Sequence, residues 1–432
     1  MTTQPVHGHP ADRGKSPEQM LAERTRRLLD VIQLKPTDRI PVQLRLGYMV
    51  AELAGTTRQE MFEKPERARA ELVKAALEFQ PDSVFGITGT PGPSRALGDR
   101  STKWPGYGLD EHGSFQFVEA DFMRAEDYDD MLEDMSDWGV RVFMPRVFGE
   151  LAGLAKLPPL GLSLFGYYGA VFNAPAFADP DVQHSMQALA EAGRLAIEFG
   201  RQARLTGEAL NAAGFPAGMY NGVLMEAPFD FLSDTMRGMK GIFLDMRRCP
   251  EKLLAAQHKV LRLQLKHAIA STRTVVQAGL PAYAGIPLHR GSDEFMSLAQ
   301  FERFYWPQLK TMLVTLVENG ITPVVFYESC WNKRLQYLTE LPRGKTVGWF
   351  EKSDIFKVKQ VIGDTMCIMG GMSVSMLTGG TVEEVRAHTR RLCEEVGKGG
   401  GYIMSTSTGE LETCRRELVH AWIDATREFG NY

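Results

Sequence analysis

Thr322-Pro-Val-Val-Phe-Tyr-Glu-Ser-Cys-Trp-Asn332 is the stretch that decides the fold of this chain. Its apolar run, residues 324–326, passes directly into a carboxylate and a thiol, Glu328 and Cys330. A strand that served only to pack in the core would not need a carboxylate and a thiol two residues apart. Parallel α/β folds place polar groups at the carboxyl ends of their strands, where binding and catalysis occur. The stretch therefore predicts a buried strand whose end belongs to a functional site.

Strands of this kind alternate with helices along the rest of the chain. Ser297-Leu-Ala-Gln300 and Thr381-Val-Glu-Glu384 are capping boxes, each typical of a helix start. Strand–helix alternation at this spacing predicts parallel pairing with right-handed crossovers. The eight expected strands lie near residues 40, 84, 220, 284, 324, 347, 368 and 403. Eight units favour an α/β fold of the closed (β/α)8 TIM-barrel type over an open sheet.

The remaining segments are predicted to belong to the same single domain or to its leader. Residues 1–19 are polar and are expected to form a disordered leader, and Ser16-Pro-Glu-Gln19 predicts the start of a leader helix. Residues 20–432 are expected to form a single barrel domain. Within it, residues 88–215 hold Gly/Pro-rich loops and a long helix over 181–210, which predicts an insertion after the second strand that lies over the barrel mouth.

Composition narrows the functional classes. The 432 residues are 44% hydrophobic with a net charge of −4, which is ample for a large core and argues against a nucleic-acid or membrane-surface role. The five cysteines include no Cys-x-x-Cys pair, which predicts a reducing, cytoplasmic location. No run of 18 apolar residues is present to span a bilayer. A small-molecule substrate and a homodimer are the expected partners.

Candidate site residues follow from their positions at the predicted strand ends. Glu328 and Cys330 could supply half of the ligands of a zinc site. The alternative is that Glu328 pairs with a nearby Arg and that Cys330 is a small buried side chain. His289 is a candidate acid or base. Arg290 is a candidate to bind a substrate carboxylate through the forked donors of its guanidinium. The alternative is a surface loop in which Arg290 pairs with Asp293. Arg45 in an apolar strand needs a counter-charge, either a substrate anion or an acidic neighbour.

Several short motifs, in order, resemble the uroporphyrinogen decarboxylase superfamily, which also contains corrinoid- and coenzyme-M-linked methyltransferases. The resemblance covers about residues 20–430 and implies a (β/α)8 barrel with a site in its mouth. The matching pieces are Lys35-Pro-Thr-Asp-Arg-Ile-Pro41, Glu226-Ala-Pro-Phe229, Phe301-Glu-Arg-Phe-Tyr-Trp-Pro307, Asp354-Ile-Phe-Lys-Val-Lys359, Ile368-Met-Gly-Gly371, Gly379-Gly-Thr-Val-Glu-Glu-Val385 and Gly399-Gly-Gly-Tyr-Ile-Met404.

The methyltransferase branch of this superfamily binds zinc through His-x-Cys after strand 5 and a Cys after strand 8. The resemblance places Glu328-Ser-Cys330 at the first position and Thr408 near the second. Cys414 is six residues further on and is predicted to lie in the last helix. The resemblance thus implies a zinc site that keeps one of three ligands, with Glu328 as a substitute donor.

The decarboxylase branch has an Arg-rich motif after strand 1, an Asp after strand 2, a Tyr after strand 3 and a His after strand 8. Here Arg45-Leu-Gly-Tyr48 keeps one Arg, and the end of strand 2, Gly86-Ile-Thr88, has no Asp. The Tyr position falls near Asp234 and the His position near Thr408. These departures argue against a porphyrinogen substrate.

Three functions stay open from the sequence. The first is methyl or alkyl transfer of the corrinoid-linked demethylation type, on a small or aromatic anionic substrate, with zinc and a separate corrinoid protein as the implied cofactor and partner. The second is a metal-free decarboxylase or lyase, and the third a non-catalytic corrinoid- or tetrapyrrole-binding protein. The predicted catalytic residues are Glu328, Cys330, His289 and Asp293. The predicted substrate-binding residues are Arg45, Tyr48, Arg290, Tyr327 and Asp234.

Overall fold

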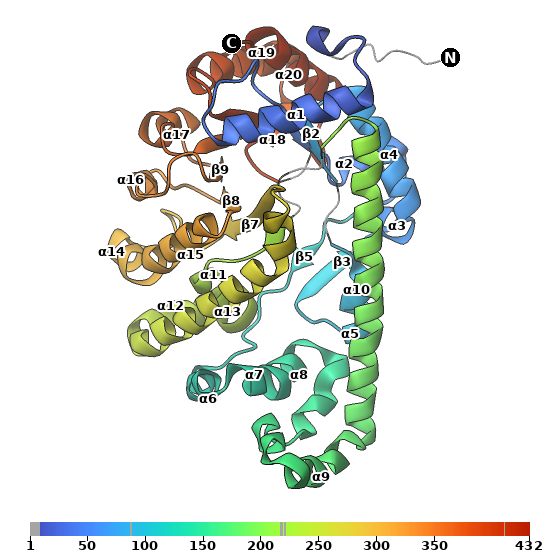
Figure 1. Ribbon diagram of the computed structural model, residues 1–432, viewed down its shortest axis with the longest axis vertical. Helices are drawn as coiled ribbons and strands as arrows, with labels where there is room; N and C mark the ends of the chain where they lie inside the picture. The colour runs from blue at the N-terminus through green and yellow to red at the C-terminus, as the bar shows by residue number, and fades with distance from the viewer. Residues whose placement is uncertain (1–8, 87–88, 217–218, 220–221, 410) are drawn as a thin grey trace.

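The computed structural model describes residues 9–432 apart from 87–88, 217–218, 220–221 and 410. Eight parallel strands form its centre (Figure 1). They are β1 (Gln43–Arg45), β2 (Ser83–Phe85), β6 (Val223–Leu224), β7 (Ala282–Leu288), β8 (Ile321–Tyr327), β9 (Val347–Phe350), β10 (Cys367–Met372) and β11 (Tyr402–Thr406). Each lies where the apolar runs of the sequence predict a strand.

The strands follow one another in the order of a (β/α)8 barrel. Six of them pair in the order β11-β10-β9-β8-β7-β6, and β1 pairs with β2. A parallel bridge between Val42 and Met404 sets β1 beside β11. The number, direction and order of the strands confirm the α/β prediction. Among the described residues no pairing joins β2 to β6, so closure of the barrel stays a prediction.

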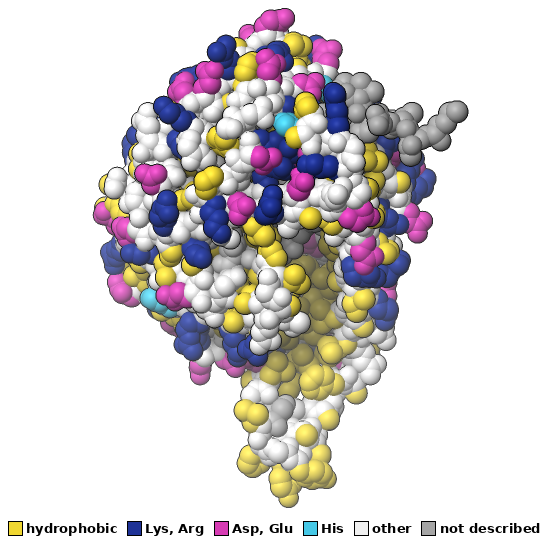
Figure 2. All heavy atoms as spheres, turned by 45° about the horizontal axis from the view of Figure 1, so that its top comes forward, with side chains coloured by type: hydrophobic (Ala, Val, Ile, Leu, Met, Phe, Trp, Pro, Cys, Tyr) yellow, Lys and Arg dark blue, Asp and Glu magenta, His cyan; other side chains and the backbone are white. Residues whose placement is uncertain are grey.

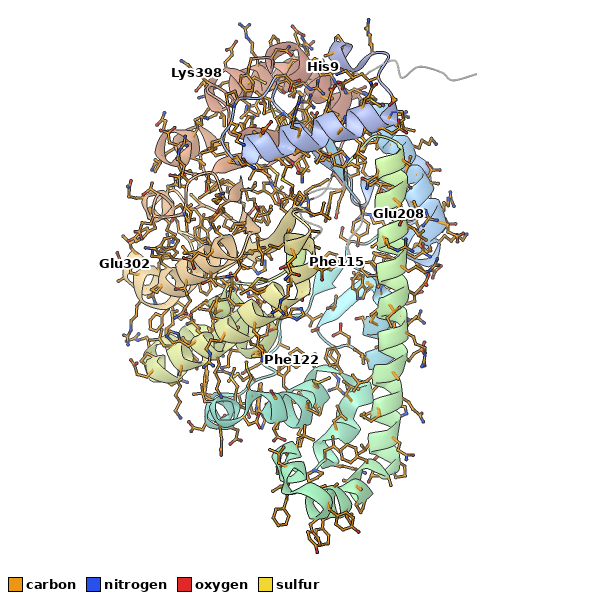
Figure 3. All side chains as sticks on the ribbon, viewed as in Figure 1. His9, Phe115, Phe122, Glu208, Glu302 and Lys398 are labelled. Atoms are coloured by element: carbon orange, nitrogen blue, oxygen red, sulfur yellow. The ribbon has the colours of Figure 1, made fainter. Side chains whose placement is uncertain are left out.

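Helices surround these strands and begin at the sequence signals named above. The capping boxes at Ser16–Gln19, Ser297–Gln300 and Thr381–Glu384 all form. The main helices are α1 (Pro17–Ile32), α4 (Pro65–Phe79), α12 (Gly238–Arg248), α13 (Pro250–Gln277), α15 (Trp306–Glu318), α17 (Ile355–Ile362), α19 (Val382–Arg391) and α20 (Arg416–Phe429). Because α20 begins only at Arg416, the prediction that Cys414 lies in the last helix is wrong. Side chains fill the space between strands and helices (Figure 3).

The leader helix α1 packs against the inward side chains of the strands. Leu28 and Val31 form one buried cluster with Val324, Phe326 and Trp349. Before α1, residues 10–12 form a short 3-10 helix, and Asp12 accepts hydrogen bonds from Arg39 at 3.0 and 3.3 Å. Disorder was expected over residues 1–19, and residues 1–8 of that leader lie outside the described chain.

The insertion after β2 forms a projection beside the strands. It contains a small sheet of β3 (Thr102–Pro105), β4 (Gly108–Leu109) and β5 (Gln116–Phe117), followed by short helices. The long helix predicted over 181–210 is present as α10 (Pro180–Ala212), which runs down one side of the molecule (Figure 1). The acidic segment over 126–138 forms two short helices, α6 (Tyr128–Glu133) and α7 (Met135–Trp138), because Asp134 adopts extended backbone between them.

Candidate functional site

Polar side chains from three neighbouring strand ends meet on one side of the molecule. Glu226 follows β6, His289 and Arg290 follow β7, and Glu328 follows β8. Two further acids come from the turns after β6, where α11 (Pro228–Leu232) and the π-helix η6 (Ser233–Arg237) carry Asp230 and Asp234. The carboxyl ends of parallel strands meet at one edge, so residues distant in sequence converge here. Of the predicted residues, His289, Arg290, Asp234 and Glu328 are brought together.

His289 is the centre of this group. Its Nδ1 is hydrogen-bonded to the carboxylate of Asp234, and its Nε2 lies 3.6 Å from Glu328 Oε1. Burial lowers the pKa of His289, but the bond to Asp234 and the charges of Asp230 and Glu328 outweigh it and raise the pKa to about 9. The imidazole therefore holds a proton at neutral pH, with Nε2 facing Glu328.

Asp230 is fully buried beneath His289 and holds the backbone of the β7 end in place. Its carboxylate accepts hydrogen bonds from the backbone N–H groups of His289 at 2.9 Å and Arg290 at 3.1 Å, and from the Tyr305 hydroxyl at 2.5 Å. Burial, followed by the charge of Asp234, raises its pKa above the usual range. Sequence reasoning missed this residue. The available signal was a single acid in the apolar turn Ala227-Pro-Phe-Asp-Phe-Leu232.

Glu226 is a second acid with a raised pKa. Burial, and then the negative charge of Asp234, raises the pKa of Glu226 to about 7. Its Oε2 is buried and has no hydrogen-bond partner among the residues described, whereas its backbone is fixed by Gln264 on both sides. A buried carboxyl oxygen without a partner is costly when ionised, which is the physical reason for the shift.

Glu226→Gln is expected to change the pH dependence of stability. Because the folded pKa is raised from an ordinary value near 4.5 to about 7, the native state is stabilised below pH 4.5, and this stabilisation is lost as pH rises through 7. The amide does not titrate. The variant's advantage in free energy of unfolding should therefore grow from near zero at pH 4.5 to at most about 3 kcal/mol at pH 8. Urea unfolding at both pH values measures this, and a difference independent of pH would contradict the raised pKa.

Arg290 is held by the same acids. Its Nε donates to Asp234 Oδ1 at 2.9 Å and to Ser233 Oγ at 3.2 Å, and its guanidinium lies 5.5 Å from the ring centre of Phe295. The ion pair expected between Arg290 and Asp293 is not what the geometry shows, since Arg290 pairs with Asp234 instead. Asp234 thus binds both His289 and Arg290 and fixes their relative positions.

Cys330 and Asp293 form a separate contact. The Cys330 thiol lies 3.7 Å from Asp293 Oδ2, and burial raises the pKa of Cys330, so the thiol is protonated at neutral pH. Asp293 also accepts hydrogen bonds from the buried guanidinium of Arg334 and from the backbone of Lys333 at 3.0 Å. Its carboxylate is therefore occupied by structural bonds.

Zinc fits this arrangement poorly. Glu328 faces His289, whereas Cys330 faces Asp293, so the two predicted metal ligands do not converge. Within the described part of the chain, no three His, Cys, Asp or Glu side chains are placed to hold a metal ion together. The zinc site on Glu328 and Cys330 stays a prediction that these positions do not support.

The other three predicted binding residues contact other side chains. The Arg45 guanidinium lies over the rings of Phe85 and Trp349, 4.5 and 4.7 Å from their centres. Tyr48 lies under the guanidinium of Arg58, at 4.9 Å. Tyr327 stacks on Phe350 with ring centres 4.6 Å apart, among side chains that pack against the outer helices. Arg45 thus shares a buried aromatic neighbour, Trp349, with the inward cluster of the strands.

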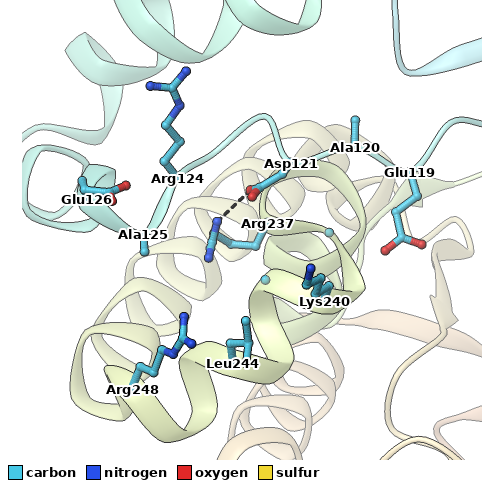
Figure 4. Close-up of a pocket in the computed structure, with 12 residues that line it drawn as sticks. Glu119, Ala120, Asp121, Arg124, Ala125, Glu126, Arg237, Lys240, Leu244 and Arg248 are labelled. Atoms are coloured by element: carbon cyan, nitrogen blue, oxygen red, sulfur yellow. Dashed lines mark hydrogen bonds and ion pairs between the residues drawn. The ribbon is translucent and has the colours of Figure 1, made fainter.

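A groove of about 670 Å³ lies beside the site, between residues 119–126 and α12 (Figure 4). Arg237 forms one wall, where it donates to Asp121 at 2.7 Å and to Asp245 at 2.6 Å. Met239, at the start of α12, contacts the Arg290 guanidinium through its sulfur at 3.8 Å. None of the predicted catalytic or binding residues lines this groove.

Comparisons with known proteins agree with this architecture. The family model described as uroporphyrinogen decarboxylase (URO-D) matches residues 205–429, more than half of the chain. A uroporphyrinogen decarboxylase of Methylococcus capsulatus is 23% identical over 177 residues, which are 41% of this chain and 49% of that protein. The chain thus spans about half the length of this curated relative.

A solved structure has a similar fold over nearly the whole molecule. This methyltransferase from Methanosarcina mazei superposes with a TM-score of 0.59 at 18% identity, covering 94% of this chain and 98% of that chain. At this identity the likeness shows the fold. Since 94% of the chain is covered, the likeness extends beyond the region matched by the family model. By its family match, this chain is a member of the uroporphyrinogen decarboxylase (URO-D) family.

Proposed function

We propose that this protein is an enzyme that removes a methyl or alkyl group from oxygen in a small or aromatic anionic substrate and passes it to an external acceptor. The observation that carries the proposal is the proton held on His289 by Asp234, at the edge where the strands end. The family match and the methyltransferase-like fold support an enzymatic role of this kind. No helix in the described residues has the length and apolarity needed to cross a membrane.

The proposed methyl or alkyl transfer needs an acid that protonates the substrate oxygen. The carbon–oxygen bond of an ether breaks, the alkyl group joins the nucleophilic atom of the acceptor, and the electron pair remains on the substrate oxygen. The Nε2 proton of His289 then moves to that oxygen, and Asp234 stays ionised beside the neutral imidazole. A general acid of this type contributes about 10²–10⁴-fold to a rate. The charge of His289 acts on Glu226, and the raised pKa of Glu226, about 7, makes it a candidate to return the proton.

The substrate's anionic group would pair with Arg45. Its guanidinium lies over two aromatic rings, and its strand β1 lies beside β11. The acceptor would be a corrinoid carried by a separate protein, or a thiol. Both are nucleophiles that take a methyl group without further reaction at the substrate oxygen, and in this account both act as substrates.

The direct test mixes the purified protein with chemically reduced cobalamin and 4-hydroxy-3-methoxybenzoate or methoxybenzoates. Formation of methylcobalamin, followed by its visible absorbance, together with the matching phenol, is the expected result. The same assay with a thiol acceptor is read by mass spectrometry of the thioether. The absence of methyl transfer to either acceptor class across a panel of methyl ethers would contradict the proposal.

Decarboxylation is the second candidate, favoured by the family match and by a protonated His289 that could equally protonate a carbanion. In that reaction the bond to the carboxyl carbon breaks, CO₂ leaves, and the proton moves to carbon. Release of ¹³CO₂ from carboxyl-labelled substrates, lost in Arg45→Ala, would support it. A visible absorption band on purification without turnover would favour the third reading, a corrinoid- or tetrapyrrole-binding protein.

Cys330→Ala separates these acid-based reactions from zinc chemistry. Because the thiol faces Asp293 and not Glu328, the substitution is expected to change turnover by no more than about twofold, the range of a change outside the site. Metal content of the purified protein is measured in parallel. A large loss of activity together with loss of bound zinc would show that Cys330 is a ligand.

A further inference from the structure

The groove between residues 119–126 and α12 is a cavity that the proposed reaction does not use. Its volume of about 670 Å³ lies within the range of small-molecule sites, which is about 300–1,000 Å³. Hydrophobic side chains gather at the projecting end of the molecule (Figure 2), whereas the lining of the groove is mainly charged. The groove is therefore a place where a polar ligand could bind.

One wall of the groove consists of charges that already have partners. Arg237 is 5% exposed and forms ion pairs with Asp121 and with the buried Asp245. The carboxylate of Glu119 accepts a hydrogen bond from a backbone N–H in the first turn of α12. These contacts fix the wall in place and compensate its positive and negative groups within the chain.

Three further cations in the lining have no acidic partner. Lys240 and Arg248 project from α12, and Arg124 comes from the facing segment (Figure 4). None of the three forms an ion pair with an Asp or Glu of the described residues. Glu126, the remaining acid of the lining, has no ion-pair partner there either. Positive charge is thus in excess, and a cleft with an excess of one sign attracts ligands of the other.

Apolar surface separates these charges. Lys240, Leu244 and Arg248 are spaced four residues apart, so they share one face of α12, with Leu244 in the middle (Figure 4). Ala120 and Ala125 contribute to the lining from the facing segment. A ligand in the groove would therefore meet an apolar strip that has a cation at each end. Small-molecule sites commonly combine apolar surface with a few polar groups in this way.

We propose that the groove binds a small organic dianion, whose apolar body lies on Leu244 and whose anionic groups are phosphate or carboxylate. The guanidinium groups of Arg124 and Arg248 present forked donors that suit the oxygens of either group. Lys240 adds a point charge at the other end of the strip. An extended acidic peptide fits less well, because it would have to run past the unpaired carboxylate of Glu126.

The groove adjoins the candidate site but is separate from it. Arg237 and Asp234 belong to the same five-residue π-helix, η6, and Asp234 binds His289 on the other side. None of the residues from which the proposed reaction is derived lines the groove. The inference therefore does not rest on the proposed function, and binding measurements test it without an activity assay.

Isothermal titration calorimetry of the full chain at mildly alkaline pH and physiological ionic strength is the test. Phenyl phosphate or isophthalate should bind, and the tighter of the two identifies the preferred anionic group. Inorganic phosphate lacks the apolar body and benzoate the second charge, so both should bind more weakly. Lys240→Gln combined with Arg248→Gln should weaken binding about tenfold or more, because two of three unpaired cations are lost. Both side chains are exposed, so the thermal midpoint should not change.

Arg262→Gln combined with Lys266→Gln is the matched control. It removes one exposed Arg and one exposed Lys from α13, neither of which lines the groove. This variant should bind like the wild type. A wild type that binds neither dianion at millimolar concentration, or an equal loss in both double variants, would overturn the proposal. Loss of binding in Arg45→Ala, with full binding in the groove variant, would also overturn it, because the probe would then bind among the strands.

Discussion

His289→Ala is expected to lower turnover by about 10²–10⁴-fold while leaving the fold intact, whichever reaction the site performs. His289 is the proton donor in methyl transfer from an ether and in decarboxylation alike. Its side chain is anchored by the single carboxylate of Asp234, and the backbone of its loop is held separately by Asp230. The loss should therefore appear in kcat more than in the free energy of unfolding.

Two controls separate this role from a structural one. His267→Gln changes an exposed histidine of α13 that is hydrogen-bonded to Ser271, and it should leave turnover unchanged. In the wild type, kcat/KM should fall as pH rises through about 9, because His289 is then deprotonated. Wild-type turnover by His289→Ala, or the same high-pH limb in that variant, would remove His289 from the chemistry.

Arg334→Met is expected to destabilise the protein by about 3–5 kcal/mol, the usual effect of removing one partner from a buried ion pair. Arg334 is 1% exposed, donates to Asp293 and to the backbone oxygen of Met296, and lies 5.0 Å from the ring centre of Phe301. Methionine fills a similar volume but leaves the Asp293 carboxylate buried beside it without its cation. Urea unfolding at pH 7 measures the effect.

The matched control is Arg303→Met, whose partner Glu251 is solvent-exposed. Exposed pairs contribute about 0–1 kcal/mol, so this variant should lose little. Adding Asp293→Asn to Arg334→Met should restore part of the loss by removing the unpaired charge. An Arg334→Met variant as stable as Arg303→Met would show that Asp293 is not held by this pair and reopen its predicted catalytic role.

Local sequence signals were sufficient for the strands and helix starts, because apolar runs and capping boxes act within a few residues. The directions of the site side chains depend on distant contacts. Glu328 and Cys330 would share one face if the strand continued, but β8 ends at Tyr327 and Ser329 adopts a positive φ of 58°. The turn sends the carboxylate toward His289 and the thiol toward Asp293. That separation could not be read from the spacing alone.

Asp230 is a second residue whose contacts could not be predicted from the local sequence. Its partners, the backbone N–H groups of His289 and Arg290, lie about 60 residues away in the chain, with separations of 59 and 60. Nothing within the Ala227–Leu232 turn specifies them, so its importance emerges only when β6 and β7 pair. His289 and Glu328 could be placed at this edge of the sheet for the opposite reason, since both directly follow a strand whose end the sequence defines.

NMR titration of ¹⁵N-labelled histidine tests most directly whether Asp234 keeps a proton on His289 at neutral pH. In the wild type, His289 should titrate with a pKa of about 9. In Asp234→Asn the largest raising contribution is removed, so the pKa should move downward and the imidazole should lose its proton at lower pH. A neutral His289 at pH 7.5 in the wild type would contradict the account.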